Sequence, residues 1–85
     1  MSGTLTLYTR IGCGLCEEME AALPPWQRRL GFEVETVDVD SEEVLARDYG
    51  DKVPLLADGD GREICRYFFD ESALQAYFAS SGSLL

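Results

Sequence analysis

The chain has no histidine and few cations, and each shortage excludes a class of function. Without histidine it lacks the commonest general base and metal ligand, so hydrolysis of the Ser-His or Cys-His kind is not available to it. Its 85 residues carry 7 Lys and Arg against 16 Asp and Glu, which gives a net charge of −9. Because nucleic acids and anionic membranes bind basic patches, we expect neither as a partner.

Cysteine and long apolar runs are also scarce. Three cysteines do not make the disulfide framework of a small secreted protein, which usually has more of them and in even number. No apolar run approaches the roughly 18 residues that span a membrane, and the first residues lack the basic-then-apolar layout of a secretory signal. Since 46% of the residues are hydrophobic, we expect one globular, cytoplasmic, monomeric domain over residues 1–85, with a frayed tail at 79–85.

Hydrophobic periodicity predicts the secondary structure. The expected strands are residues 4–9, 32–40, 55–57 and 63–68. The expected helices are residues 15–30, with a kink or a restart at Pro24-Pro25, then 41–49, then 71–80. Asp40 and Glu43 have capping-box spacing for the second helix, and Asp70 can cap the third. The order β-α-β-α-β-β-α predicts an α/β fold in which the first two strands are parallel and the last two antiparallel.

The segment Cys13-Gly14-Leu15-Cys16 follows the first strand and opens the first helix. A spacing of three puts both thiols on one side of the first turn and brings their Cα atoms to roughly the 5–6 Å that a disulfide accepts. Free N–H groups at a helix start stabilise a thiolate, so Cys13 is the candidate nucleophile and Cys16 the candidate resolving thiol. An inert buried pair, a zinc site and an iron–sulfur cluster shared by two chains are the alternatives.

Pro54 precedes the third strand, where it removes a backbone donor. This placement leaves the N–H and C=O groups of Val53 free to pair with an incoming extended peptide. The alternative is an ordinary proline at the start of a strand, with a trans peptide bond.

Together these segments resemble the glutaredoxin branch of the thioredoxin fold. LYTRIGCGLC is similar to the strand–turn–dithiol segment of that family and KVPLL to its cis-proline segment, and the match runs from about Leu5 to Tyr77. The resemblance implies an α/β, thioredoxin-like (glutaredoxin-type) fold, with a four-stranded mixed sheet flanked by three helices and a cis Val53-Pro54 bond facing the dithiol. It also implies exchange with protein disulfides or glutathione mixed disulfides, and no cofactor beyond an external thiol such as glutathione.

The sequence departs from the glutaredoxin pattern at two places. Gly14-Leu15 replaces the usual Pro-Tyr between the cysteines, and bulky residues 66–69 stand where the family usually has a Gly-Gly pair. Glycine allows close approach of a ligand and bulky side chains do not. Asp70 remains as a candidate acidic contact to glutathione, whose use we expect to be weak.

Three of the seven cations, Arg10, Lys52 and Arg66, belong to segments that the expected fold gathers around the dithiol. A local positive rim there would bind a carboxylate-bearing partner, and surface salt bridges to the many acids are the alternative. Cys65 lies within the fourth expected strand, where we interpret it as a small buried hydrophobe, with a third redox thiol as the alternative.

The function predicted from these residues is thiol–disulfide exchange by Cys13 and Cys16. A protein of another class would use the same fold differently, as a thioredoxin-fold module that binds a partner protein through the Val53-Pro54 edge without turnover. Redox cycling of the isolated protein distinguishes the two.

Overall fold

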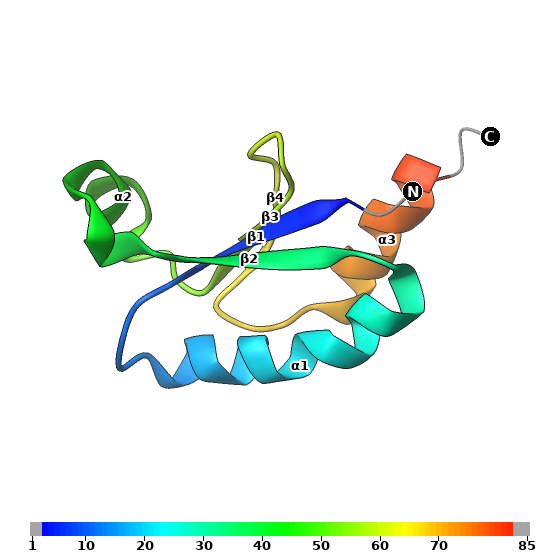
Figure 1. The fold of residues 1–85 in the computed structure, drawn as a ribbon, viewed down its shortest axis with the longest axis horizontal. Helices are drawn as coiled ribbons and strands as arrows, with labels where there is room; N and C mark the ends of the chain where they lie inside the picture. Colours follow the sequence, from blue (N-terminus) through cyan, green and yellow to red (C-terminus); the bar gives the residue numbers. More distant parts are fainter. Residues whose placement is uncertain (1–2, 83–85) are drawn as a thin grey trace.

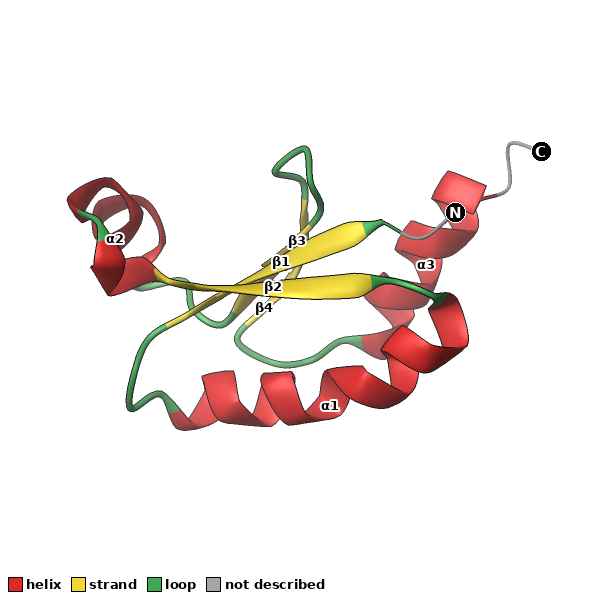
Figure 2. Ribbon diagram, in the orientation of Figure 1, coloured by secondary structure: helices red, strands yellow, loops and turns green. Residues whose placement is uncertain are grey.

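A four-stranded mixed sheet forms the centre of the structure, a computed structural model that describes residues 3–82 (Figure 2). Its strands are β1 (Thr4–Thr9), β2 (Glu33–Asp38), β3 (Leu55–Ala57) and β4 (Glu63–Arg66). Their spatial order is β2-β1-β3-β4, with β1 parallel to β2 and antiparallel to β3, and β3 antiparallel to β4. The helices are α1 (Gly14–Leu30), α2 (Glu43–Tyr49) and α3 (Glu71–Gly82), with a 3-10 turn, η1 (Val39–Ser41), before α2. This is the element order and sheet that the sequence predicts.

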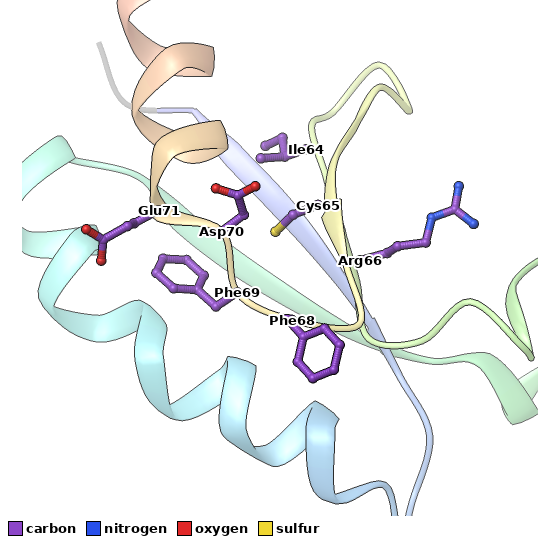
Figure 3. Close-up of a pocket in the computed structure, with 7 residues that line it drawn as sticks. All are labelled: Ile64, Cys65, Arg66, Phe68, Phe69, Asp70 and Glu71. Carbon is purple, nitrogen blue, oxygen red and sulfur yellow. The ribbon is translucent and has the colours of Figure 1, made fainter.

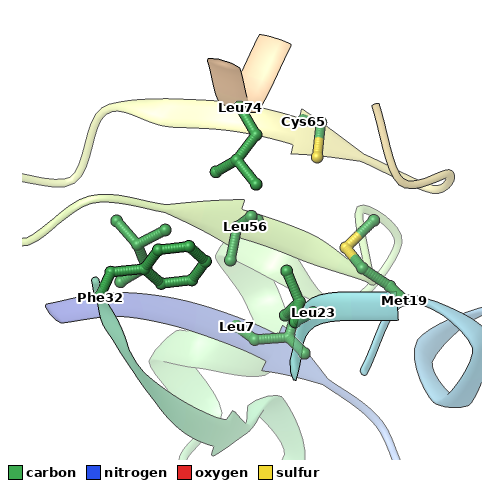
Figure 4. Close-up of a cluster of buried hydrophobic side chains, with 8 residues drawn as sticks. Leu7, Met19, Leu23, Phe32, Leu56, Cys65 and Leu74 are labelled. Atoms are coloured by element: carbon green, nitrogen blue, oxygen red, sulfur yellow. The ribbon is translucent and has the colours of Figure 1, made fainter. Parts of the chain in front are cut away.

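The core lies between one face of the sheet and the helices α1 and α3 (Figure 4). Alternation along β1 places Leu5 and Leu7 on that face, and both are buried. Met19 and Leu23 meet them from α1, and Leu74 from α3. Figure 1 shows α1 running along the sheet, with α3 behind its C-terminal end. Because α1 packs on the sheet through this stripe, the position of its N-terminus is determined by the core.

The other face of the sheet contacts α2 through an aromatic pair. The rings of Tyr8 and Tyr49 stack at 4.2 Å between centroids, with 9° between their planes. Burial, together with the hydroxyl of Tyr49, raises the pKa of Tyr8 above its ordinary value. Val44 is 51% exposed, whereas Leu45 and Tyr49 are half-buried, so α2 packs through these two residues and not through Val44.

Helix α1 continues through Pro24 and Pro25 without a break. Each proline removes one intrahelical N–H donor, which ordinarily kinks or ends a helix. Here both prolines are exposed, whereas Met19 and Leu23 before them are buried. Trp26 and Leu30 after them also pack against the core, so core packing on both sides of the pair holds the two halves in one helix. The helix ends at Leu30, as predicted, and is capped by Gly31, which has φ 73° and donates its N–H to the carbonyl of Gln27 at 2.9 Å.

The predicted capping box of the second helix is wrong. The strand expected over residues 32–40 ends at Asp38, whose carboxylate accepts the N–H of Asp40 at 2.9 Å and so starts η1. Helix α2 then begins at Glu43, and its N-cap residue, Glu42, makes no side-chain cap bond. The carboxylate of Asp40 is held by Arg10 instead, so a long-range ion pair replaces the local cap.

Two further boundaries differ from expectation. Strand β4 ends at Arg66 rather than at residue 68, because Tyr67 turns the chain with φ 69°. Helix α3 starts as predicted, with the carboxylate of Asp70 accepting the N–H of Ala73 at 3.0 Å, but it continues to Gly82. Residues 79–82 are therefore helical and not a frayed tail, and residues 83–85 lie outside the described residues. None of the helices within residues 3–82 is long and apolar enough to cross a membrane.

Candidate active site

Cys13 and Cys16 form a disulfide at the first turn of α1, with their Cα atoms 5.2 Å apart. Gly12, at φ 82°, turns the chain after β1, and the N–H of Cys13 donates to the carbonyl of Arg10 at 3.2 Å. Cys13 is the N-cap residue, and its sulfur accepts the N–H of Cys16 at 3.1 Å. The local geometry that the CxxC spacing predicts is therefore present.

The two sulfurs differ in their access to solvent. Cys16 lies on the core side of α1 and is 3% exposed, whereas Cys13 is half-buried at the tip of the helix. Thiol–disulfide exchange needs in-line access to the attacked or attacking sulfur. An incoming thiol or disulfide can therefore reach Cys13 but not Cys16.

The Val53-Pro54 segment lies at the same end of the sheet as the disulfide. Its peptide bond is cis, and Pro54 is buried. Leu55, the next residue, pairs with Tyr8 in β1 and with Arg66 in β4. Since β1 leads from Tyr8 into the turn that carries Cys13, the strand register brings Pro54 beside the base of that turn.

The backbone of Val53 is unpaired within residues 3–82. The N–H of Lys52 donates to the carbonyl of Tyr49, and the carbonyl of Pro54 accepts the N–H of Tyr67 at 2.7 Å. Neither the N–H nor the C=O of Val53, which lies between them, has a hydrogen bond to the described part of the chain. A half-buried peptide group in this state is available to an extended ligand.

Arg10 connects three segments of the fold. Its guanidinium donates to both carboxylate oxygens of Asp40, at 2.9 and 3.1 Å, and to the carbonyl of Gly50 at 2.9 Å. The hydrogen bond to Asp40 raises the pKa of Arg10, so its charge is permanent and paired. The structure thus uses Arg10 to tie the Cys13 turn to η1 and to the end of α2.

The other predicted contact residues have different surroundings. Arg66 forms a bidentate pair with Glu63, at 2.8 and 2.7 Å, and Asp70 is occupied as the cap of α3. Within residues 3–82 the ammonium group of Lys52 has no ion pair. Of the three cations expected at the rim, Lys52 is therefore the one without an ion pair among the described residues, although, together with the hydrogen bond from Arg66, its charge helps to lower the pKa of Glu63.

The role of Tyr67 at this end of the sheet could not be predicted from the sequence. Its N–H donates to the carbonyl of Pro54, and its hydroxyl donates to the carbonyl of Asp51 at 3.1 Å. The guanidinium of Arg66 lies 5.9 Å from its ring centre. A non-glycine residue at positive φ is uncommon and costs about 1 kcal/mol or more. The sequence did contain one signal for this conformation. Tyr67 stands in the segment where glutaredoxins usually carry glycines, and glycine is the residue that most readily adopts a positive φ.

Cys65 lies under the loop that follows β4 (Figure 3). Its sulfur points toward Phe69 and Asp70 and forms part of a pocket of about 510 Å³, which Arg66 and Phe68 also line. Burial raises the pKa of the Cys65 thiol above its ordinary value of 9.0; the N–H of Asp70 opposes this rise and nearby carboxylates add to it. Cys65 is a free thiol and a member of the hydrophobic core, as the simpler interpretation predicts.

Potential metal ligands are dispersed in the structure. Among residues 3–82 there is no group of three or more Cys, Asp or Glu side chains placed to hold one metal ion.

The four-stranded mixed sheet, with a disulfide at the start of a helix beside a cis proline, has the arrangement of a thioredoxin-like fold. Comparison with known proteins agrees. Residues 4–79 match the model of the Glutaredoxin-like domain (DUF836) family. The chain belongs to this family.

The relatives extend over most of the chain. The solution structure of protein Ne2328 from Nitrosomonas europaea is similar with a TM-score of 0.81 and 42% identity, over 91% of this chain and 92% of that one. Uncharacterized protein Rv0508 from Mycobacterium tuberculosis is 35% identical over 88% of this chain and 81% of its own length. A mutant thioredoxin from Halobacterium salinarum is similar with a TM-score of 0.67 and 28% identity, over 96% of this chain and 76% of that one.

Proposed function

We propose that the protein is a thiol–disulfide oxidoreductase in which Cys13 is the nucleophile and Cys16 the resolving thiol. The observation that carries this proposal is the Cys13–Cys16 disulfide at the first turn of α1, with Cys13 accessible and Cys16 buried. Two cysteines that pair at this geometry can store and release two electrons without rearranging the fold.

The start of α1 supplies the chemistry that the nucleophile needs. A thiolate at Cys13 accepts the N–H of Cys16, as its sulfur already does in the disulfide. The aligned peptide dipoles of a 17-residue helix add positive partial charge at the same place. Both interactions favour the thiolate, which is the reactive form.

The reaction proceeds in two exchanges. The Cys13 thiolate attacks one sulfur of a substrate disulfide, the substrate S–S bond breaks, and the second substrate sulfur leaves as a thiolate that takes a proton. The Cys16 thiolate then attacks the Cys13 sulfur of the mixed disulfide and releases the first substrate sulfur as a second thiol. The protein becomes oxidised, the substrate gains two electrons and two protons, and an external thiol or dithiol reduces Cys13–Cys16 again.

The substrates proposed are protein disulfides or glutathione mixed disulfides, in a cytoplasmic setting where external thiols keep the dithiol reduced. A second candidate is binding of an extended peptide at Val53 without turnover. The unpaired backbone of Val53 favours it, because that contact needs no electron transfer.

Turnover of a disulfide separates the two candidates. The assay follows reduction of oxidised 2-mercaptoethanol under a low concentration of dithiothreitol, with the wild type, Cys13→Ser, Cys16→Ser and Cys65→Ser. We expect the wild type and Cys65→Ser to accelerate the reaction, Cys13→Ser to be inactive, and Cys16→Ser to be strongly impaired. Equal rates with and without wild-type protein would contradict the oxidoreductase proposal and favour the binding module.

A further inference from the structure

We infer that the preferred substrate is an extended polypeptide disulfide in which a large apolar residue and a Lys or Arg flank the reacting cysteine, and that glutathione is a poor substrate. This inference rests on the proposed function and specifies its substrate class.

The first reason is the shortage of unpaired positive charge around the disulfide. Glutathione carries two carboxylates and needs cations to hold them. Arg10 and Arg66 are each bound in bidentate pairs, to Asp40 and Glu63, with N–O distances of 2.7 to 3.1 Å. A second anion would have to compete with these carboxylates, against a chain whose net charge is −9. Lys52 alone is a weak anchor for two carboxylates.

The second reason is an apolar groove that begins at Leu15, the residue next to Cys16 in the chain. It has a volume of about 310 Å³ and lies between α1 and the loop after β4, with Leu15, Met19 and Phe68 among its lining residues. Leu15 stands between the two cysteines in sequence, and Phe68 is 68% exposed and directed toward α1 (Figure 3). Exposed aromatic and aliphatic side chains beside a reactive sulfur favour contact with an apolar substrate side chain.

The third reason is the charge inside that groove. Glu18 lines it, and no Lys or Arg does. Glu17, which lies in the first turn of α1, adds negative charge beside the disulfide. A cationic side chain next to the substrate cysteine complements these carboxylates, whereas an acidic one is repelled.

The fourth reason is the backbone contact that Val53 offers to a ligand. Its free N–H and C=O can hold the backbone of an extended chain at the end of the sheet that also carries Cys13. A polypeptide can use this contact and the groove together, which a tripeptide of three small units cannot do as fully. The combination selects a polypeptide with side chains on both sides of its cysteine.

Single-turnover reduction by the fully reduced protein tests this inference. The probes are oxidised 2-mercaptoethanol, oxidised glutathione, and the homodimeric disulfides of three short peptides: one with Lys and Leu flanking the cysteine, one with Glu in place of Lys, and one with Ser in place of Leu. We expect the Lys–Leu peptide to react about tenfold faster than the Ser peptide, because its Leu side chain fills the groove and Ser does not. The Glu peptide should be about threefold slower than the Lys peptide at low salt, and this difference should shrink at 1 M salt.

Matched variants assign the effects to the groove. Phe68→Ala should remove most of the advantage of Leu over Ser, whereas Val44→Ala, at an exposed apolar site on α2, should not. Glu18→Gln should remove the preference for Lys over Glu, whereas Glu33→Gln should not. Glu33 is an exposed residue that pairs with Thr4, the first residue of β1, far along the strand from the disulfide.

The outcomes separate this inference from the function on which it rests. Reduction of every probe at similar rates, or fastest reduction of glutathione, would overturn the substrate class and leave the oxidoreductase in place. Failure to reduce even oxidised 2-mercaptoethanol would overturn both. Preferences that persist unchanged in Phe68→Ala and Glu18→Gln would show that the groove does not cause them, which also overturns the inference.

Discussion

Three thiols of the same intrinsic chemistry have different environments in this chain. Cys13 stands at the tip of α1, Cys16 lies one turn further in against the core, and Cys65 is buried in β4. Burial disfavours the thiolate, and the N-terminus of a helix favours it. The division of roles among the three therefore follows from position.

That division predicts the order of alkylation. In the reduced protein at pH 8, iodoacetamide should modify Cys13 first, Cys16 more slowly, and Cys65 only after unfolding, because burial raises the pKa of Cys65 above 9.0. Peptide mapping after timed quenching measures the order. Modification in urea should label all three, which is the control for reagent competence, and early labelling of Cys65 in the native state would contradict the assignment.

Asp58 is a second residue whose environment makes a prediction. It is buried in the β3–β4 turn, and burial by itself would raise the pKa of its carboxyl. Hydrogen bonds from the N–H groups of Arg62 and Asp60, at 2.8 and 3.0 Å, and from the hydroxyl of Tyr77 outweigh that effect and hold the pKa below 3.8. The ionised carboxylate therefore stabilises the folded state.

Asp58→Ala should lower the free energy of unfolding by about 2 kcal/mol at pH 7, since it removes a buried carboxylate that accepts hydrogen bonds from two backbone N–H groups. A lowered pKa in the folded state gives stability that is present above pH 3.8 and is lost as the pH falls through the folded-state pKa. The difference between wild type and variant in urea unfolding should thus shrink below about pH 4. Asp60→Ala, in the same turn but exposed, is the control, and a deficit independent of pH would refute this account.

At the scale of elements, the hydrogen bonds of Arg10 to Asp40 and Gly50, which we call the Arg10 clamp, determine the position of the turn that carries the disulfide. It joins the loop after β1 to η1 through Asp40 and to the end of α2 through Gly50. Gly50 is buried, and a Cβ atom there would collide with the carbonyl of Ala46 and come within 2.8 Å of the Arg10 guanidinium. The clamp thus occupies space that only glycine leaves free.

We predict that Arg10→Ala and Asp40→Ala each lower the midpoint of urea unfolding, and that the double variant loses less than the sum of the two. Arg47→Ala serves as the control and should have little effect. Arg47 pairs at 3.4 Å with Asp48, its neighbour in sequence, and both side chains are exposed. Strictly additive losses for Arg10 and Asp40 would mean that the pair is not coupled in solution.

The elements also show which features could be predicted from the sequence. Signals within a few residues worked: the alternation of β1, the Gly31 stop and the Asp70 cap each depend on neighbours along the chain. Signals that tertiary contacts override did not work. Asp40 had the spacing of a cap but is held by Arg10, 30 residues away. Of the two outcomes predicted for Pro24-Pro25, the restart is excluded, because α1 is one helix whose residues pack on the core before and after the pair.

The candidate site divides in the same way. Spacing alone predicted the positions of Cys13 and Cys16, and the resemblance to glutaredoxins placed Val53-Pro54 beside them. The pairing of Arg10 and Arg66 with acids could not be predicted, because a chain with 16 acids offers each cation many possible partners. The left-handed conformation of Tyr67 was also hidden, since the residue type argues against it.

At the scale of the whole molecule, a net charge of −9 on 85 residues makes self-repulsion a general destabilising factor. We predict that raising NaCl from 0.1 to 0.5 M increases the free energy of unfolding by about 1 kcal/mol, because the Debye length falls and the acidic surface is screened. Glu33→Gln, which removes one exposed charge, should show a smaller increase. A loss of stability on adding salt would mean that ion pairs, rather than repulsion, dominate.

The central claim is that Cys13 exchanges with substrate disulfides and Cys16 resolves the product. Mass spectrometry of Cys16→Ser after incubation with the Lys–Leu peptide disulfide tests it most directly, because the mixed disulfide cannot be released without the resolving thiol. We predict one peptide per chain, attached at Cys13, and no adduct in Cys13→Ser. An adduct at Cys65, or no adduct in Cys16→Ser, would contradict the account.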